Sequence, residues 1–279
     1  DAVDAKNSVL CAGLDPAEYG MGREDMGLLE GASKEEFAYK FIDAVGHLVA
    51  GLKPNTQYWR GDGDQEALKR IITYAHEEYG LVVVEDTKFA DIGSTNDAGF
   101  YFAEDRGDDA VTIAPYAGNM EEAAKQGRER GLGVITMVLM SNPEFEVEKN
   151  NLIDVTGTQD YYAEVDKIWV GNKAYVPNYV HLARNARDFG LDGIVVGAPS
   201  PSNHISEEEL QTVSFYAGNE ALVLMPGLGA QGGEAESVFK KFGSKRVIAS
   251  VGRAMMFPED SDQAAAGRYF KDLFNEQRG

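Results

Sequence analysis

The feature that most constrains the fold is an alternation of short β-branched runs with longer amphipathic segments along the chain. Each short run predicts a buried strand, and each longer segment predicts a helix after it. Eight such strand-then-helix units follow one another within the 279 residues. Strict alternation favours a parallel sheet, and eight units are the number that closes a (β/α)8 barrel, also called a TIM barrel.

The predicted strands are rich in Val, Ile and Leu and cover residues 8–14, 50–53, 81–84, 110–113, 134–140, 193–196, 221–224 and 247–250. The predicted helices cover residues 34–49, 65–78, 95–104, 120–130, 178–189, 207–215, 234–242 and 263–274. An open doubly wound sheet is the alternative. It would more often carry a G-x-G-x-x-G turn after its first strand, whereas this chain reads Gly13-Leu14-Asp15-Pro16 there.

One large core is expected, because 43% of the residues are hydrophobic. We therefore interpret residues 1–279 as a single barrel domain with an elaborated, polar segment after the fifth strand, at 142–177. That segment contains Trp169 and is expected to form a lid or a dimer contact. No apolar run is long enough for a membrane span, and the first residues do not resemble a signal peptide. The single Cys11 lies in an apolar run, which predicts a buried thiol and suits a reducing cytoplasm.

The net charge is −20, with the acidic residues scattered along the chain. This balance argues against binding to nucleic acid or to an anionic membrane surface. The plain interpretation is a well-solvated surface that keeps the protein highly soluble. Adaptation to a salty cytoplasm is a second interpretation. An acidic protein that binds an anionic ligand needs a local group of Lys and Arg residues, so the placement of these residues is informative.

Polar residues and glycines collect where the predicted strands end, which is where (β/α)8 barrels carry their chemistry. Asp86 and Lys88 follow the third strand and are two residues apart, so their side chains are expected on one face. Opposite charges there keep each other ionised, and Lys88 is a candidate proton donor. Asp91 lies on the turn into the next helix. The structural alternative is an ion pair followed by a helix capped by Ser94 or Thr95.

Lys53 and Asp15 end two neighbouring strands and should reach the same barrel mouth. A solvent-reaching lysine and a turn residue before Pro16 are the plain alternatives. The loop 226–233 contains four glycines before a predicted helix, and Gly252-Arg253 follows the last strand. Free backbone N–H groups and a guanidinium suit a phosphate, and barrels commonly bind phosphate after strands seven and eight. The four histidines lack the spacing of a metal site.

The stretch from Asp86 to Thr95 reads D-x-K-x-x-D-I-x-x-T, and it resembles the signature of the orotidine 5′-monophosphate (OMP) decarboxylase family. Further segments fall in family order, namely Leu14-Asp15-Pro16, Lys53-Pro54-Asn55, 226–233 and Val251-Gly252-Arg253. The Lys-Pro-Asn form is similar to a longer bacterial subgroup. The resemblance implies a cytoplasmic, cofactor-free and metal-free lyase that converts OMP to UMP and CO2 in pyrimidine biosynthesis.

The resemblance also implies roles for individual residues. Lys53, Asp86, Lys88 and Asp91 would form an alternating array of charges, with Lys88 protonating a carbanion at C6. Asp91 and Thr95 would serve the neighbouring subunit of a homodimer with shared active sites. The implied substrate contacts are Asp15 and Lys53 for the ribose, Ser141 for the pyrimidine, and Gln231, Gly252 and Arg253 for the phosphate.

Two other functions stay open on the sequence. The D-x-K-x-x-D element alone also occurs in magnesium-dependent sugar-phosphate decarboxylases and aldolases of the same suprafamily. In those relatives an acid ends the second strand, whereas this chain has Lys53. A nucleotide-binding barrel that has lost its chemistry is the non-enzymatic alternative, although every expected charge is present.

Overall fold

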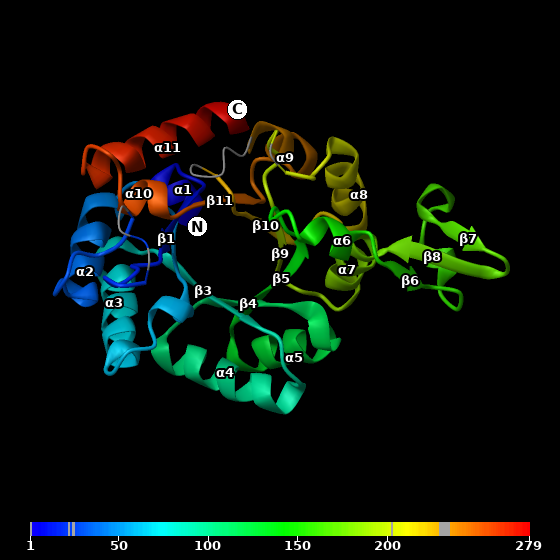
Figure 1. Ribbon diagram of the computed structural model, residues 1–279, viewed down its shortest axis with the longest axis horizontal. Helices are drawn as coiled ribbons and strands as arrows, with labels where there is room; N and C mark the ends of the chain where they lie inside the picture. Colours follow the sequence, from blue (N-terminus) through cyan, green and yellow to red (C-terminus); the bar gives the residue numbers. More distant parts are fainter. Residues whose placement is uncertain (1, 22, 24–25, 202, 229–234) are drawn as a thin grey trace.

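A closed parallel barrel forms the body of the protein (Figure 1). The computed structural model describes residues 2–21, 23, 26–201, 203–228 and 235–279. Within these residues the strand order around the barrel is β1-β11-β10-β9-β5-β4-β3-β2. These strands are β1 (Leu10–Leu14), β2 (Gly51–Pro54), β3 (Val82–Phe89), β4 (Ala110–Ile113), β5 (Gly133–Leu139), β9 (Gly193–Val196), β10 (Leu222–Met225) and β11 (Val247–Val251). The fold predicted from the alternation is confirmed.

Helices surround the barrel on its outer side (Figure 1). The longer ones are α2 (Lys34–Val45), α3 (Asp64–Tyr79), α4 (Gly93–Arg106), α5 (Met120–Arg130), α7 (Asn178–Asp188), α8 (Glu207–Ala217), α9 (Ala235–Phe242) and α11 (Gln263–Arg278). Three shorter ones are α1 (Ala2–Lys6), α6 (Phe145–Lys149) and α10 (Arg253–Met256). In the described part of the chain, no helix combines the length and apolar character needed to cross a bilayer.

Local sequence explains where several helices begin and end. The Ser33 side chain caps α2, and Ser206 forms a reciprocal capping box with Glu209 at the start of α8. Gly80 and Gly107 adopt positive φ after α3 and α4, and their N–H groups bond back to the last turn. The helix predicted over 34–49 is too long, because α2 ends at Val45 and the chain turns there toward β2.

The core lies mainly between the barrel wall and the helices, where buried side chains from nearly every element form one cluster. Phe41, Phe100 and Phe274 are fully buried there. A smaller cluster lies inside the barrel and includes Val84, Met137 and Leu224. Burial of this apolar surface is the main stabilising contribution, at roughly 25 cal/mol per Å².

The elaborated segment after β5, at 142–177, contains secondary structure that the sequence pattern did not predict. It contains α6 and a three-stranded antiparallel sheet in the order β6-β8-β7, with β6 at Leu152–Asp154, β7 at Ile168–Val170 and β8 at Lys173–Pro177. This arm projects from the side of the barrel (Figure 1). No heptad or clear alternation marks strands this short, which is why the sequence pattern missed them.

Candidate active site

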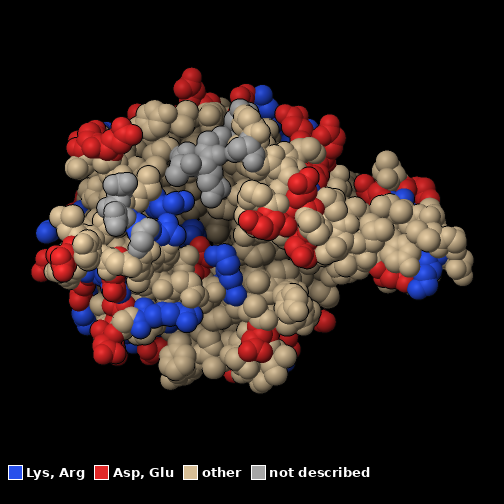
Figure 2. All heavy atoms as spheres, in the orientation of Figure 1, with Lys and Arg blue, Asp and Glu red and all other residues tan. Residues whose placement is uncertain are grey.

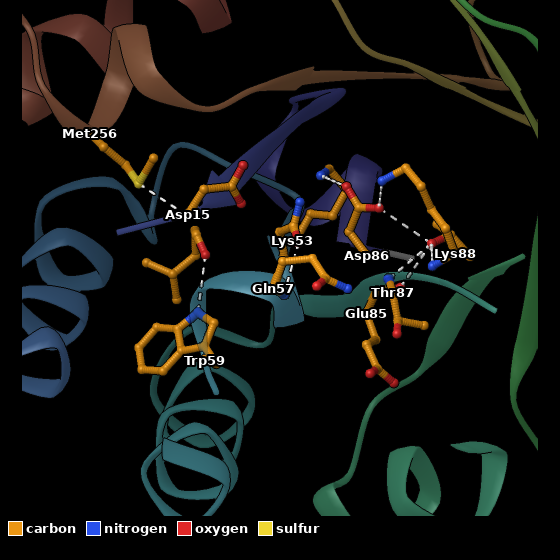
Figure 3. A network of polar contacts seen from close by, with 12 residues as sticks. Asp15, Lys53, Gln57, Trp59, Glu85, Asp86, Thr87, Lys88 and Met256 are labelled. Carbon is orange, nitrogen blue, oxygen red and sulfur yellow. Dashed lines mark hydrogen bonds and ion pairs between the residues drawn. The ribbon is translucent and has the colours of Figure 1, made fainter. Parts of the chain in front are cut away.

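Three charged residues meet on the inner wall of the barrel. Lys53 on β2 places its Nζ 2.5 Å from Asp86 Oδ2, and Lys88 Nζ contacts the other carboxylate oxygen, Oδ1. Figure 3 shows the two ammonium groups converging on Asp86 from opposite sides. Lys53 and Asp86 are buried, whereas the Lys88 side chain is partly exposed. The structure therefore brings together three of the four predicted array residues.

The neighbouring charges favour the ionised forms of Asp86 and Lys53. Burial alone would raise the pKa of Asp86, but the neighbouring ammonium groups of Lys53 and Lys88 outweigh it and lower that pKa to about 2. Burial likewise works against the charged form of Lys53, yet the Asp86 and Asp15 carboxylates raise its pKa. The site thus presents fixed positive and negative groups side by side at neutral pH.

Asp15 lies at the end of β1, beside the Lys53 side chain (Figure 3). Burial raises its pKa, and Lys53 acts in the opposite direction. Its backbone N–H bonds Met256 Sδ at 3.3 Å, and Trp59 Nε1 donates to the preceding Leu14 carbonyl at 3.3 Å. The buried Asp15 Oδ1 accepts no hydrogen bond from any described residue. The β1 end is thus held in place while one carboxylate oxygen stays available to a ligand.

Two adjacent cavities open at these strand ends. One, of about 200 Å³, is lined by Lys53, Asp86, Lys88, Thr112 and Ser141, with apolar walls that include Met137 and Leu224. The other, of about 150 Å³, is lined by Asp15, Lys53, Pro226, Gly252 and Arg253. Lys53 and Pro226 line both, so the two cavities are neighbours at the same barrel mouth. The first cavity, with its apolar walls and charged residues, suits a ring that carries a charged substituent. The second cavity, with Arg253 in its wall, suits the anionic end of the same ligand.

The second cavity depends on a close backbone approach between β1 and β11. A Cβ added at Gly13 would lie 2.9 Å from Gly252 Cα, which is too close for any side chain. The two strand ends therefore keep their spacing only with glycine at position 13. Gly252 precedes the short helix α10, which begins at Arg253. The structure thus places two of the three predicted phosphate-binding residues, Gly252 and Arg253, at the cavity wall.

Basic side chains border the hollow at the centre of the barrel mouth, and acidic ones spread around the rim (Figure 2). Lys53, Lys88 and Arg253 are the cations that line the two cavities. This arrangement explains how a protein with a net charge of −20 can bind an anionic ligand. The surface as a whole repels anions, whereas the site carries a local group of positive charges.

Asp91 and Thr95 do not belong to the cluster within one chain. Both side chains are exposed in the described structure, and the linings of the two cavities do not include them. The Asp91 loop is nevertheless well fixed, because Asn96 Nδ2 donates to the Asp91 carbonyl at 2.8 Å. Helix α4 starts at Gly93 without a side-chain cap, so the capping role considered for Ser94 or Thr95 is wrong. The predicted phosphate contact Gln231 lies outside the described residues.

Several lining residues were not predicted from the sequence. The hydroxyl of Thr112 on β4 accepts a hydrogen bond from the Lys88 backbone N–H. The apolar wall of the cavity is formed by Met137, Met140, Val195 and Leu224. Apolar residues at strand ends carry no signal that separates a site wall from ordinary core. A polar signal did exist, since Thr112 interrupts an otherwise apolar strand.

Fold and site together define a (β/α)8-barrel enzyme with an electrostatic site for an anionic substrate. The model of the orotidine 5′-phosphate decarboxylase / HUMPS family matches residues 8–268. The chain belongs to this family.

Proteins and structures similar to this chain cover nearly its whole length. It is 32% identical to an orotidine 5′-phosphate decarboxylase of Ralstonia pickettii (strain 12J), covering 94% of this chain and 89% of the relative. It is 31% identical to the enzyme of the same description from Cupriavidus taiwanensis, with the same shares covered. A crystal structure of a candidate orotidine-monophosphate decarboxylase from Toxoplasma gondii aligns with a TM-score of 0.79 at 25% identity, covering 99% of this chain and 93% of that one.

Proposed function

We propose that this chain decarboxylates orotidine 5′-monophosphate to UMP and CO2, the last step of pyrimidine nucleotide synthesis. The observation that carries the proposal is the Lys53–Asp86–Lys88 array beside two neighbouring cavities, one of them lined by Arg253. The relatives named as orotidine 5′-phosphate decarboxylases support the same activity. The single Cys11 is buried, which fits our placement of the enzyme in a reducing cytoplasm.

In this proposal the pyrimidine ring occupies the cavity that Ser141 and Lys88 line, with its carboxylate close to Asp86. Asp15 and Lys53 bind the ribose hydroxyls, because Asp15 Oδ1 is a buried acceptor without a partner among the described residues. Arg253 and the backbone at Gly252 bind the phosphate, together with Gln231. The two cavities then hold the two ends of one nucleotide.

The chemical step breaks the bond between C6 and the carboxylate carbon, and its electron pair stays on C6. The Lys88 ammonium stabilises this negative charge and then gives C6 a proton, while CO2 leaves and solvent returns a proton to Lys88. Fixed charges that need no reorganisation are an effective way to stabilise such a transition state. Asp86 holds Lys88 in place and repels the departing carboxylate.

A homodimer completes the array in this proposal. Asp91 and Thr95 are exposed, and the segment 91–116 that contains them carries exposed apolar side chains at Ile92, Phe102 and Tyr116. The Tyr116 side chain is 94% exposed. Packing these side chains against a second copy would bury them and carry Asp91 and Thr95 to the partner's site.

The deciding experiment is an OMP decarboxylation assay with a chelator present. We expect full turnover, no activity in Lys88→Ala, and near-parental activity in Lys69→Ala, a matched exposed lysine that pairs with Asp105. Loss of activity on chelation would instead favour a magnesium-dependent sugar-phosphate enzyme. Tight binding of UMP without OMP turnover would favour a barrel that only binds nucleotide. Lys88→Ala activity within tenfold of the parent would remove Lys88 from the mechanism.

The dimer is tested by mixing inactive subunits. Asp91→Ala and Lys88→Ala disable different residues, so a mixed dimer with shared sites has one intact site of two. An equimolar mixture, in which about half of the dimers are mixed, should then recover about a quarter of the parental activity. Mixing Lys88→Ala with Asp86→Ala is the control, because both changes fall in the same half-site and no recovery is expected. Absence of recovery in the first mixture, after subunit exchange has been demonstrated, would argue against the shared site.

A further inference from the structure

The strand that carries Asp86 and Lys88 is irregular where it passes β4. Glu85 pairs with Val111 and Phe89 pairs with Ile113, so three residues of β3 lie opposite a single residue of β4. That residue is Thr112. The extra length disrupts the regular ladder, which leaves the backbone N–H groups of this part of β3 in need of other acceptors.

Thr112 supplies the missing acceptor. Its hydroxyl accepts hydrogen bonds from the N–H groups of Thr87 at 3.1 Å and of Lys88 at 3.0 Å. The same oxygen lies 3.3 Å from Asp86 Oδ1 and 3.4 Å from the Glu85 carbonyl oxygen, and it can donate its single proton to either of them. Two accepted bonds and one donated bond use the full capacity of a hydroxyl. Thr112 is almost fully buried, so water does not compete for these bonds.

These bonds hold an unfavourable backbone conformation. Lys88 has φ of +54°, in the left-handed region that non-glycine residues rarely adopt. A residue held in this region is strained, and the conformation persists only when the surroundings fix it. In this conformation the Lys88 ammonium group contacts Asp86 Oδ1.

We propose that Thr112 is a positioning residue for decarboxylation, because its hydroxyl fixes the backbone of Lys88 and the carboxylate of Asp86 in the reactive arrangement. This role rests on the proposed function of Lys88 as the proton donor. Thr112 touches the array rather than the reacting atoms of the substrate. Its loss should therefore affect the catalytic step much more than nucleotide binding.

The test compares three variants by steady-state kinetics on OMP. Thr112→Val keeps the shape and removes the hydroxyl, and we expect kcat to fall roughly 10- to 100-fold with KM within about threefold. Thr112→Ser restores the hydroxyl and should recover most of kcat. Thr136→Val is the matched control, because Thr136 is fully buried on neighbouring β5 and its hydroxyl has no partner among the described residues. It should leave kcat unchanged.

Three outcomes would overturn the proposal, namely an unchanged kcat in Thr112→Val, an equal loss in Thr136→Val, or no recovery in Thr112→Ser. If the valine variant does not fold, Thr112→Cys replaces it, and activity equal to that of Thr112→Ser would overturn the role of the hydroxyl. Hydrogen exchange of the Thr87 and Lys88 amides in the free protein gives a second test, without substrate. Exchange should accelerate at least tenfold in Thr112→Val, and unchanged exchange would overturn the hydroxyl's hold on the backbone even if the parent failed to decarboxylate OMP.

Discussion

Glu85 and Asp86 are neighbours on β3, yet they lie on opposite faces of the barrel wall and their pKa values shift in opposite directions. Asp86 faces the cavity and Glu85 faces away from it (Figure 3). Both are buried. Their difference shows how the local count of charges, rather than burial, decides whether a buried carboxylate stays ionised.

Asp86 is one carboxylate between two cations, whereas Glu85 shares one cation with a second acid. Arg106 at the end of α4 places its Nη2 2.6 Å from Glu85 Oε2 and 3.0 Å from Asp108 Oδ2. The contact with Glu85 is close but not aligned as a hydrogen bond. Burial raises the pKa of Glu85 to about 8 and that of Asp108 to about 6, and Arg106 offsets only part of this effect. The inner cluster, formed by Lys53, Asp86 and Lys88, is suited to catalysis. The outer cluster, formed by Glu85, Arg106 and Asp108, joins β3 to α4.

The sharpest way to break this comparison is to neutralise each acid without changing its shape. Asp86→Asn should lower kcat on OMP by about a thousandfold or more, because Lys53 and Lys88 lose the negative charge that holds them in place. Glu85→Gln should keep kcat within about tenfold. Steady-state kinetics on both variants measures the difference, and comparable losses would show that the two faces of β3 are not functionally distinct.

A second prediction concerns the outer cluster alone. Arg106→Met leaves the buried Asp108 carboxylate, which is ionised at pH 7, without its cation, and removing one partner of a buried ion pair typically costs about 3–5 kcal/mol. Urea unfolding at pH 7 measures this loss in the free energy of unfolding, and kcat per folded molecule should change little. Arg70→Met is the matched control, because Arg70 pairs with Glu35 at the surface and its loss should be much smaller. Equal destabilisation of both variants would contradict a special role for Arg106.

The smallest expected effect is a difference in the pH dependence of stability. The folded protein holds a proton on Glu85 up to a pKa of about 8, whereas the unfolded chain releases it near 4.5. Stability should therefore fall as pH rises between these values, by at most about 1.4 kcal/mol per pH unit. Between pH 6 and 8 the Asp108 contribution is largely complete, since its pKa is about 6.

Urea unfolding at several pH values from 5 to 8 checks this slope. It should be reduced in Glu85→Gln relative to the parent, because glutamine does not titrate. Asp86 behaves in the opposite sense, since its lowered pKa adds stability that is lost only as pH falls toward about 2. An identical slope in parent and Glu85→Gln would refute the protonated state of Glu85.

The sequence predicted the barrel and most of the site because both depend on local order. Each strand-then-helix unit has its own hydrophobic pattern, and the carboxyl ends of parallel strands must meet at one mouth. Asp15, Lys53, Lys88 and Arg253 could thus be placed before their contacts were known. The arm after β5 was not predictable in this way, because its short strands pair with one another across turns that carry no strong periodicity.

The sequence by itself determined which chemistry the chain can carry, through the residue types at successive strand ends. Only the tertiary structure decided how Asp86 and Lys88 meet. The prediction relied on regular strand alternation, whereas the observed contact depends on an irregular β3, a left-handed Lys88 and the Thr112 hydroxyl on the next strand. The same holds for the two pKa shifts on β3, because Lys53 reaches Asp86 and Arg106 reaches Glu85 from distant parts of the chain.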